Sequence, residues 1–150
     1  MRKHFLSLIL LSFLVASMAT TALCQAKQPT RSLAQQGDSV WILITSVKAD
    51  KRAEFEKFVH EILWAGANKL SKEEQKPFQQ SRILHPVAPE ADGTYSYIFF
   101  IDPVVTGGNY DIESLLTKMY GEAKAKEHNK LWYESVVGEQ KSYRVVQSRH

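Results

Sequence analysis

Two stretches of the chain alternate in a way that predicts β-strands with apolar side chains on both faces. In residues 40–47 one face carries Val40, Ile42 and Ile44, and the other carries Trp41, Leu43 and Val47. In residues 94–101 one face carries Tyr95, Tyr97, Phe99 and Ile101, and the other carries Ile98 and Phe100. A sheet that is apolar on both faces needs cover on both. Because the rest of the pattern supplies helices for one face only, we expect a partner subunit or a lid over the second.

The remaining pattern predicts helices between the strands. Apolar residues recur at helical spacing over 51–68, for which Asp50 is the expected N-cap, and again from residue 111 or 112 as far as Gly138. The pattern predicts that the region from residue 111 or 112 to Gly138 forms two helices or one kinked helix. Ser71 and Glu74 form a capping-box pattern that predicts a short helix over 71–76. Strands are predicted at 40–47, 82–85, 94–101 and 141–147, with a tight hairpin at Asp92-Gly93 before the third.

The resulting order, β-α-β-β-α-β, predicts an α+β, ferredoxin-like fold with a four-stranded antiparallel sheet and helices on one face. Two such sheets can pack face to face as a dimeric α/β barrel. A bare apolar face of several hundred Å² is rare on a soluble monomer. We therefore expect a homodimer through the sheet face, with a second copy covering the aromatic-lined side of residues 94–101.

The N-terminal segment has the order of a secretory signal peptide. Arg2, Lys3 and His4 precede the apolar stretch 5–19, and small or polar residues follow. We interpret residues 1–24 as signal peptide, 25–38 as a flexible polar leader and 39–150 as the folded domain. Cleavage after Cys24 or after Ala26 fits the pattern, and predicts a periplasmic or secreted protein with no stable membrane insertion after cleavage. An uncleaved anchor over 5–23 and a lipoprotein acylated at Cys24 are the alternatives, although Leu23 makes a poor lipobox.

Charge and cysteine content exclude several classes of function. Arg2 and Lys3 account for two of the 19 basic residues, so 17 remain against 16 acidic ones after cleavage. This balance gives no support for nucleic-acid binding. Cys24 is the only cysteine, so neither a disulfide nor a cysteine metal site is expected. The histidines show no metal-ligand spacing, and Trp64 occupies the position where a zinc-protease motif needs histidine. We therefore predict no metal site and no cofactor.

The opening strand Val40-Trp41-Ile42-Leu43-Ile44, the helix start at 51–58 and the long second helical region resemble the dimeric α/β-barrel superfamily. That superfamily includes antibiotic-biosynthesis-monooxygenase-like, NIPSNAP-like and stress-responsive barrel families. The resemblance implies a pocket between the sheet and its own helices, used for cofactor-independent oxygenation, haem cleavage or related chemistry. Its enzymes typically place an Asn of the first strand, a Trp and a His around that pocket. This chain has Trp41 and Thr45 in that strand and no Asn.

The candidate site residues are histidines and aromatic side chains. His60 and Trp64 are one helical turn apart, and the helical angle places Trp64 opposite Phe55, away from the main apolar stripe. Trp64 could line a pocket with His60 as proton carrier or ligand, or it could pack beneath residues 69–81 or against the partner subunit. His128 could ligate a haem iron or be solvated between lysines. His85, at a strand end, could act as a base, but no carboxylate partner is identifiable from the sequence. The candidate ligand-binding residues are Trp64, Tyr95, Tyr97 and Trp132, and the catalytic candidates are His60 and His128.

Two hypotheses for function follow. The first is an exported dimeric protein that binds a small apolar ligand or acts as an interaction module. The second is a cofactor-independent monooxygenase or haem-handling enzyme that uses His60, Trp64, Tyr95, Tyr97 or His128. A pocket on the helix side lined by two or more of His60, Trp64, His128 and Tyr97 would favour the enzyme.

Overall fold

A computed structural model describes residues 32–149. The predicted signal peptide and the first half of the predicted leader, residues 25–31, lie outside these residues. Short 3-10 turns (η1, η3) and a π-helical turn (η2) are interspersed with regular helices. The elements in chain order are β1 (Ser39–Val47), η1 (Ala49–Lys51), α2 (Arg52–Lys57), η2 (Phe58–Trp64), η3 (Ala67–Lys69), α3 (Lys72–Gln80), β2 (Ser81–Leu84), β3 (Tyr95–Ile101), α4 (Ile112–Tyr120), α5 (Glu122–Ser135) and β4 (Lys141–Val146).

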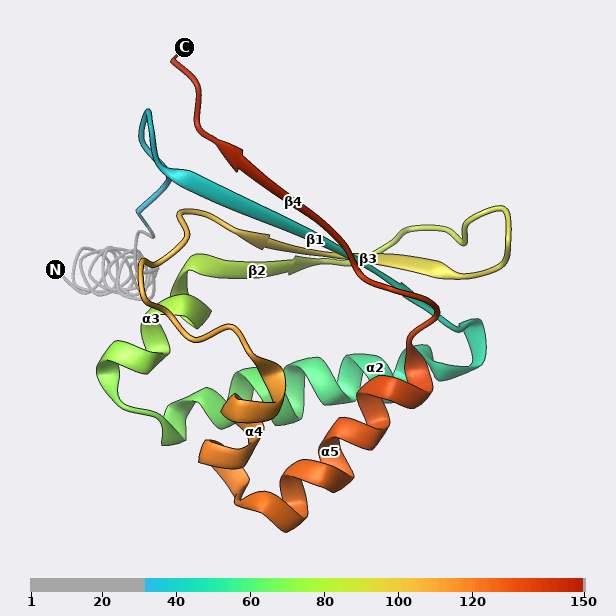
Figure 1. Cartoon of the computed structure of the whole chain (residues 1–150). Helices are drawn as coiled ribbons and strands as arrows, with labels where there is room; N and C mark the ends of the chain where they lie inside the picture. The colour runs from blue at the N-terminus through green and yellow to red at the C-terminus, as the bar shows by residue number, and fades with distance from the viewer. Residues whose placement is uncertain (1–31, 150) are drawn as a thin grey trace, which may run out of the picture. The chain divides into compact units, whose positions relative to one another are not determined.

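The four strands form one antiparallel sheet in the order β2-β3-β1-β4. The register pairs Ile42 with Phe100 on one side of β1 and with Tyr143 on the other. The helices lie under one face of the sheet, and the opposite face is open (Figure 1). The α+β class and the four-stranded antiparallel sheet are therefore as predicted, and the arrangement is compatible with a ferredoxin-like fold.

The aromatic face of the sheet belongs to the core. Tyr97 and Phe99 point toward the helices, where Phe55 lies 4.7 Å from the Tyr97 ring and 6.5 Å from the Phe99 ring, centroid to centroid. Phe55 and Tyr97 are fully buried. The expectation that a second copy covers this aromatic face is therefore wrong. The helical stripe of the chain itself is aromatic and shields these rings from water.

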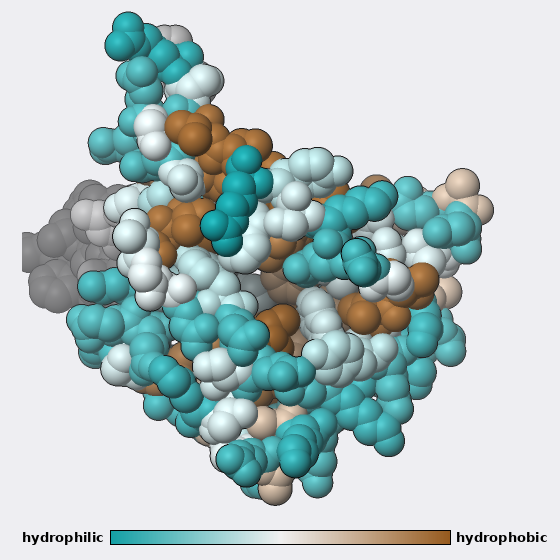
Figure 2. Space-filling view, viewed as in Figure 1, coloured by the Kyte–Doolittle hydropathy of each residue, from teal (hydrophilic) through white to brown (hydrophobic). Residues whose placement is uncertain are grey.

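The open face is also apolar. Its centre is made by Ile42, Ile44, Ile98 and Phe100, which are half-buried. Around them Leu84 is 44% exposed, Tyr143 52% and Val145 46%. Figure 2 shows a hydrophobic patch over β1 and β4. The prediction of a sheet with two apolar faces is correct. The face that lacks cover, however, is the one that carries Ile98 and Phe100, and not the one that carries Tyr97 and Phe99.

The first long helix departs from the expected regular α-helix. It begins with the turn η1, and no side chain caps it, so the prediction of Asp50 as N-cap is wrong. Over Phe58–Trp64 the helix widens into π-helical geometry, and the Ala65 amide donates to the His60 carbonyl, five residues back. Its end lies against α4, where an added Cβ on Gly66 would stand 2.6 Å from the Tyr120 hydroxyl.

The other helices are close to expectation. Ser71 and Glu74 form the predicted capping box, but α3 continues through Pro77 to Gln80 instead of stopping near residue 76. The second helical region is two helices, separated at Gly121, which has a φ of +78° that favours glycine. Ten residues connect β2 and β3, so the expected tight hairpin is a longer loop with a turn from Glu90 to Gly93.

Candidate functional site

A cavity of about 120 Å³ lies between the sheet and the helices. All three tryptophans of the chain line it. Trp41 comes from β1, Trp64 from η2 and Trp132 from α5, so three elements far apart in the sequence each contribute an indole. Figure 2 shows hydrophobic residues between the sheet and the helical layer, seen from outside. A cluster of indoles around unfilled space differs from the ordinary close packing of a core.

The rest of the cavity wall is almost entirely apolar. Trp64 lies nearly parallel to Phe99, with ring centroids 6.1 Å apart, and meets the edge of Phe78 at 5.8 Å. Trp132 packs at 6.1 Å from the same Phe99 ring. Further lining residues include Leu43, Leu63, Ile101, Ile112 and Leu115. No residue that lines the cavity carries a charge, which disfavours an ionic ligand.

The π-helical turn explains how Trp64 reaches this cavity. In a regular α-helix nine residues span two and a half turns, which would point Trp64 about 180° away from Phe55. A π-helical turn advances each residue by a smaller angle, so the η2 segment brings Trp64 back toward the sheet and onto Phe99. The predicted position of Trp64 on the face opposite Phe55 was therefore wrong. Trp64 does pack against the segment 69–81, where it contacts Phe78.

The few polar side chains at the cavity already have partners within the chain. Ser81 Oγ donates to the Pro77 carbonyl at 2.7 Å. Asn109 donates to Ser114 Oγ at 3.0 Å, and Gln140 Nε2 donates to Thr45 Oγ1 at 2.7 Å. These bonds satisfy polar groups without directing them at a ligand, so recognition in the cavity depends mainly on shape and apolar contact.

A polar network lies beside the cavity, between the first helix and β3. The buried Tyr97 hydroxyl donates to Glu56 Oε1, and Arg52 Nε donates to the Tyr97 hydroxyl at 3.3 Å. The hydrogen bond from Tyr97 lowers the pKa of Glu56, whereas burial raises the pKa of Tyr97. The Arg52 guanidinium also stacks 4.0 Å from the centre of the Tyr95 ring. The network keeps Glu56 ionised at neutral pH.

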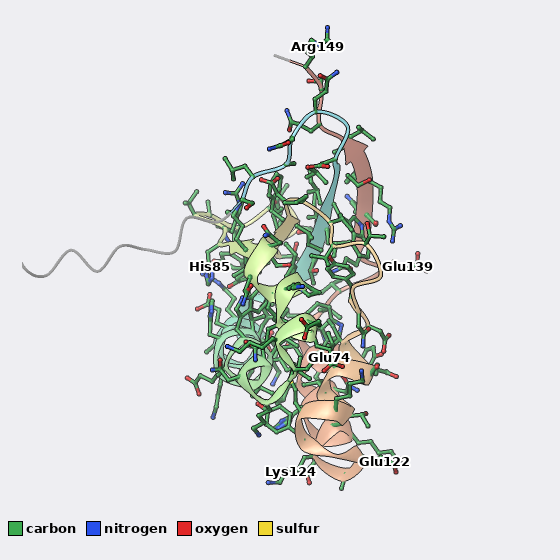
Figure 3. All side chains as sticks on the ribbon, turned by 90° about the vertical axis from the view of Figure 1, so that its left-hand side faces the viewer. Glu74, His85, Glu122, Lys124, Glu139 and Arg149 are labelled. Atoms are coloured by element: carbon green, nitrogen blue, oxygen red, sulfur yellow. The ribbon has the colours of Figure 1, made fainter. Side chains whose placement is uncertain are left out.

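Two histidines extend this network to the surface. His85 Nδ1 lies 3.6 Å from Glu56 Oε1, and His85 Nε2 lies 3.0 Å from His60 Nε2. In Figure 3 His85 lies at the outer edge of the molecule, close to the helical layer. No carboxylate partner for His85 could be identified from the sequence, because Glu56 lies 29 residues earlier on a separate element. One signal was present, since Glu56 and His60 are spaced i, i+4 on one helix.

The predicted site residues therefore fall into three groups. Trp64 and Trp132 line the cavity. Tyr95 and Tyr97 belong to the polar network with Arg52, and His60 is exposed at its outer end. His128 packs its ring 4.8 Å from Tyr120, and burial lowers its pKa. Sequence reasoning did not select Trp41, Phe78 or Leu115 as cavity residues, because each sits within an ordinary amphipathic pattern.

Comparison with family models, with curated proteins and with solved structures found no match to this chain. Within residues 32–149, no helix is long and apolar enough to cross a bilayer. In the same range, no group of three or more His, Cys, Asp or Glu side chains is arranged to hold a metal ion.

Proposed function

We propose that this protein binds a small, uncharged, apolar molecule with a single aromatic ring in the cavity lined by the three tryptophans. The observation that carries the proposal is an indole-lined space of about 120 Å³ without charged lining residues. An apolar protein cavity of about 150 Å³ accepts benzene. The space between the three tryptophans is of comparable size, so it suits a molecule with one ring.

Size and charge argue against larger ligands. Haem is a macrocycle with two carboxylates, and the cavity has neither comparable volume nor a cationic lining residue. Of His60, Trp64, His128 and Tyr97, only Trp64 lines the cavity. The oxygenase or haem-handling hypothesis remains a prediction, and the position of its candidate histidines outside the cavity favours ligand binding over that chemistry.

Tryptophan fluorescence provides the test, since every indole of the chain contacts the proposed ligand site. Titration with 4-methylphenol is expected to change the emission in a saturable way, whereas haemin at equal concentration gives no saturable binding. The variant Trp64→Ala should weaken the 4-methylphenol response, while Val87→Ala, at an exposed position outside the cavity, should leave it unchanged. A flat trace with 4-methylphenol, indole and toluene alike would refute the proposal.

We also propose that a second copy of the chain covers the open face of the sheet. Support comes from the contiguous apolar centre of Ile42, Ile44, Ile98 and Phe100, since such patches on soluble proteins usually mark interfaces. Sedimentation velocity of the purified protein should give a dimer. Ile44→Lys should shift it to a monomer, whereas Ala53→Lys, on the exposed side of α2, should not. A wild-type monomer at all concentrations would refute this.

Export is proposed on the residues of the N-terminal segment alone. The order of basic, apolar and small residues over 2–24 supports a cleaved signal peptide and a periplasmic or secreted location. N-terminal sequencing of the protein recovered from the expressing cells and from their medium tests this. A mature chain that begins after Cys24 or Ala26 is expected, and recovery of only the intact N-terminus from the cytoplasm would overturn it.

A further inference from the structure

His60 and His85 converge at the surface with the geometry of a chelating pair. Their Nε2 atoms are 3.0 Å apart, and their rings are nearly parallel, with an interplanar angle of 13°. The ring centroids are 5.1 Å apart, too far for rings in face-to-face contact, so the rings approach edge to edge with their Nε2 atoms facing each other. Both side chains are accessible to solvent.

The nitrogen separation matches two neighbouring ligands of one transition-metal ion. With metal–nitrogen bonds of about 2.0–2.1 Å, nitrogens 3.0 Å apart subtend an angle of about 94° at the metal. That angle is close to the 90° between adjacent ligands in tetragonal or octahedral coordination, whereas a tetrahedral site would need about 3.3 Å. Because the two Nε2 lone pairs face each other, each ring would need to turn by about 43° to direct its lone pair to one point beside the pair; both side chains are exposed to solvent.

Glu56 supplies the support that metal-binding histidines usually have. A carboxylate commonly accepts the N–H of the ring nitrogen that does not bind the metal, which fixes the tautomer and directs the other nitrogen outward. Glu56 Oε1 lies 3.6 Å from His85 Nδ1, and Tyr97 and Arg52 hold it in place. Glu56 therefore lies on the Nδ1 side of the His85 ring, which leaves His85 Nε2 directed at His60.

We propose that His60 and His85 together bind a divalent transition-metal ion, with water completing its coordination. Cu²⁺ is expected to bind most tightly, because it prefers tetragonal nitrogen coordination and stands highest in the affinity series of the first-row divalent ions. Sequence spacing could not indicate this site, since its ligands are 25 residues apart on a helix and at a strand end. The proposal does not depend on the ligand cavity.

Titration of the full chain with Cu²⁺, followed by calorimetry and electron paramagnetic resonance, tests the proposal. We expect one Cu²⁺ ion to bind tightly per chain, with a paramagnetic resonance spectrum that shows two equatorial imidazole nitrogens. His60→Asn and His85→Asn should each weaken binding by about tenfold or more and remove one of the two nitrogens, while His128→Asn retains both. Glu56→Gln should lower the affinity by about 10- to 100-fold without changing the nitrogen count.

Circular dichroism of each variant provides the folding control, and the exposed positions of His60 and His85 favour native spectra. Cu²⁺ should also raise the melting temperature of the wild type, because it would link the first helix to the end of β2. The proposal is overturned by any of three results from folded protein. The first is that no Cu²⁺ ion binds tightly, and the second is a spectrum without two imidazole nitrogens. The third is unchanged Cu²⁺ binding in the His60→Asn, His85→Asn double variant.

Discussion

The cavity makes a stability prediction that a closely packed core would not make. Leu115 is buried and lines the cavity, whereas its neighbour Leu116 is fully buried in the core and does not line it. The same change, Leu to Phe, adds three carbon atoms at either position. At Leu115 these atoms have about 120 Å³ of space to enter, whereas the fully buried Leu116 does not border this space.

The magnitudes follow from burial and packing. A cavity of this volume corresponds to roughly 3 kcal/mol of missing packing, at about 24 cal/mol per Å³. Three added carbons gain up to about 2.4 kcal/mol at roughly 0.8 kcal/mol each, which offsets the usual strain of about 1–3 kcal/mol from overpacking. Leu115→Phe should therefore stay within about 1 kcal/mol of the wild type. Leu116→Phe should lose about 1–3 kcal/mol.

Urea unfolding followed by circular dichroism measures both variants. A second readout is the thermal shift produced by 4-methylphenol. At ten times its dissociation constant a ligand stabilises the wild type by about 1.4 kcal/mol, which is a shift of several degrees for a domain of this size. Leu115→Phe should lose this shift and Leu116→Phe should keep it. Equal destabilisation by both changes, or a ligand response that survives in Leu115→Phe, would refute the reasoning.

Three further predictions concern other contacts. Gly66→Ala should destabilise the protein despite the higher helix propensity of alanine, because its Cβ would meet the Tyr120 hydroxyl at 2.6 Å; in urea unfolding, Tyr120→Phe should make the same change less costly. Glu74, between α3 and α4 in Figure 3, has its pKa lowered from 4.5 to about 2 by hydrogen bonds from Lys118 and then Ser71. Its stabilising effect is therefore complete above about pH 4.5 and lost as the pH falls toward 2, so stability measured across this range should fall less in Glu74→Gln than in the wild type. Burial lowers the pKa of His128, so its ring protons in an NMR titration should report a midpoint below the usual 6.5, and a midpoint above that value would contradict the packing against Tyr120.

The strands and the capping box could be predicted because their signals are local. Alternation over 40–47 and 94–101 indicates strands with two apolar faces, and the spacing of Ser71 and Glu74 indicates a helix start. Which face the helices cover is not local, since it depends on how the strands connect in space. A second copy was consequently predicted to cover the aromatic side of β3, which the helices of the same chain cover.

The candidate site depends on features with no local signal. A period of 3.6 residues assumes a regular helix, so it misplaced Trp64, which the π-helical turn rotates toward Phe99. The contact of His85 with Glu56 depends on packing β2 beside the first helix. The sequence pattern placed Trp41 in a strand, but only the folded chain brings Trp41 to the same cavity as Trp132.

The widened turn at Phe58–Trp64 has a consequence for how binding preferences in this fold can diversify. Substitutions that restored a regular helix at the same chain length would swing every side chain beyond the turn by roughly 100° relative to Phe55. A different residue would then replace Trp64 at the cavity wall, although the wall residues themselves were unchanged. In a lineage of such proteins, substitutions that straighten this turn would alter selectivity as effectively as substitutions in the wall itself.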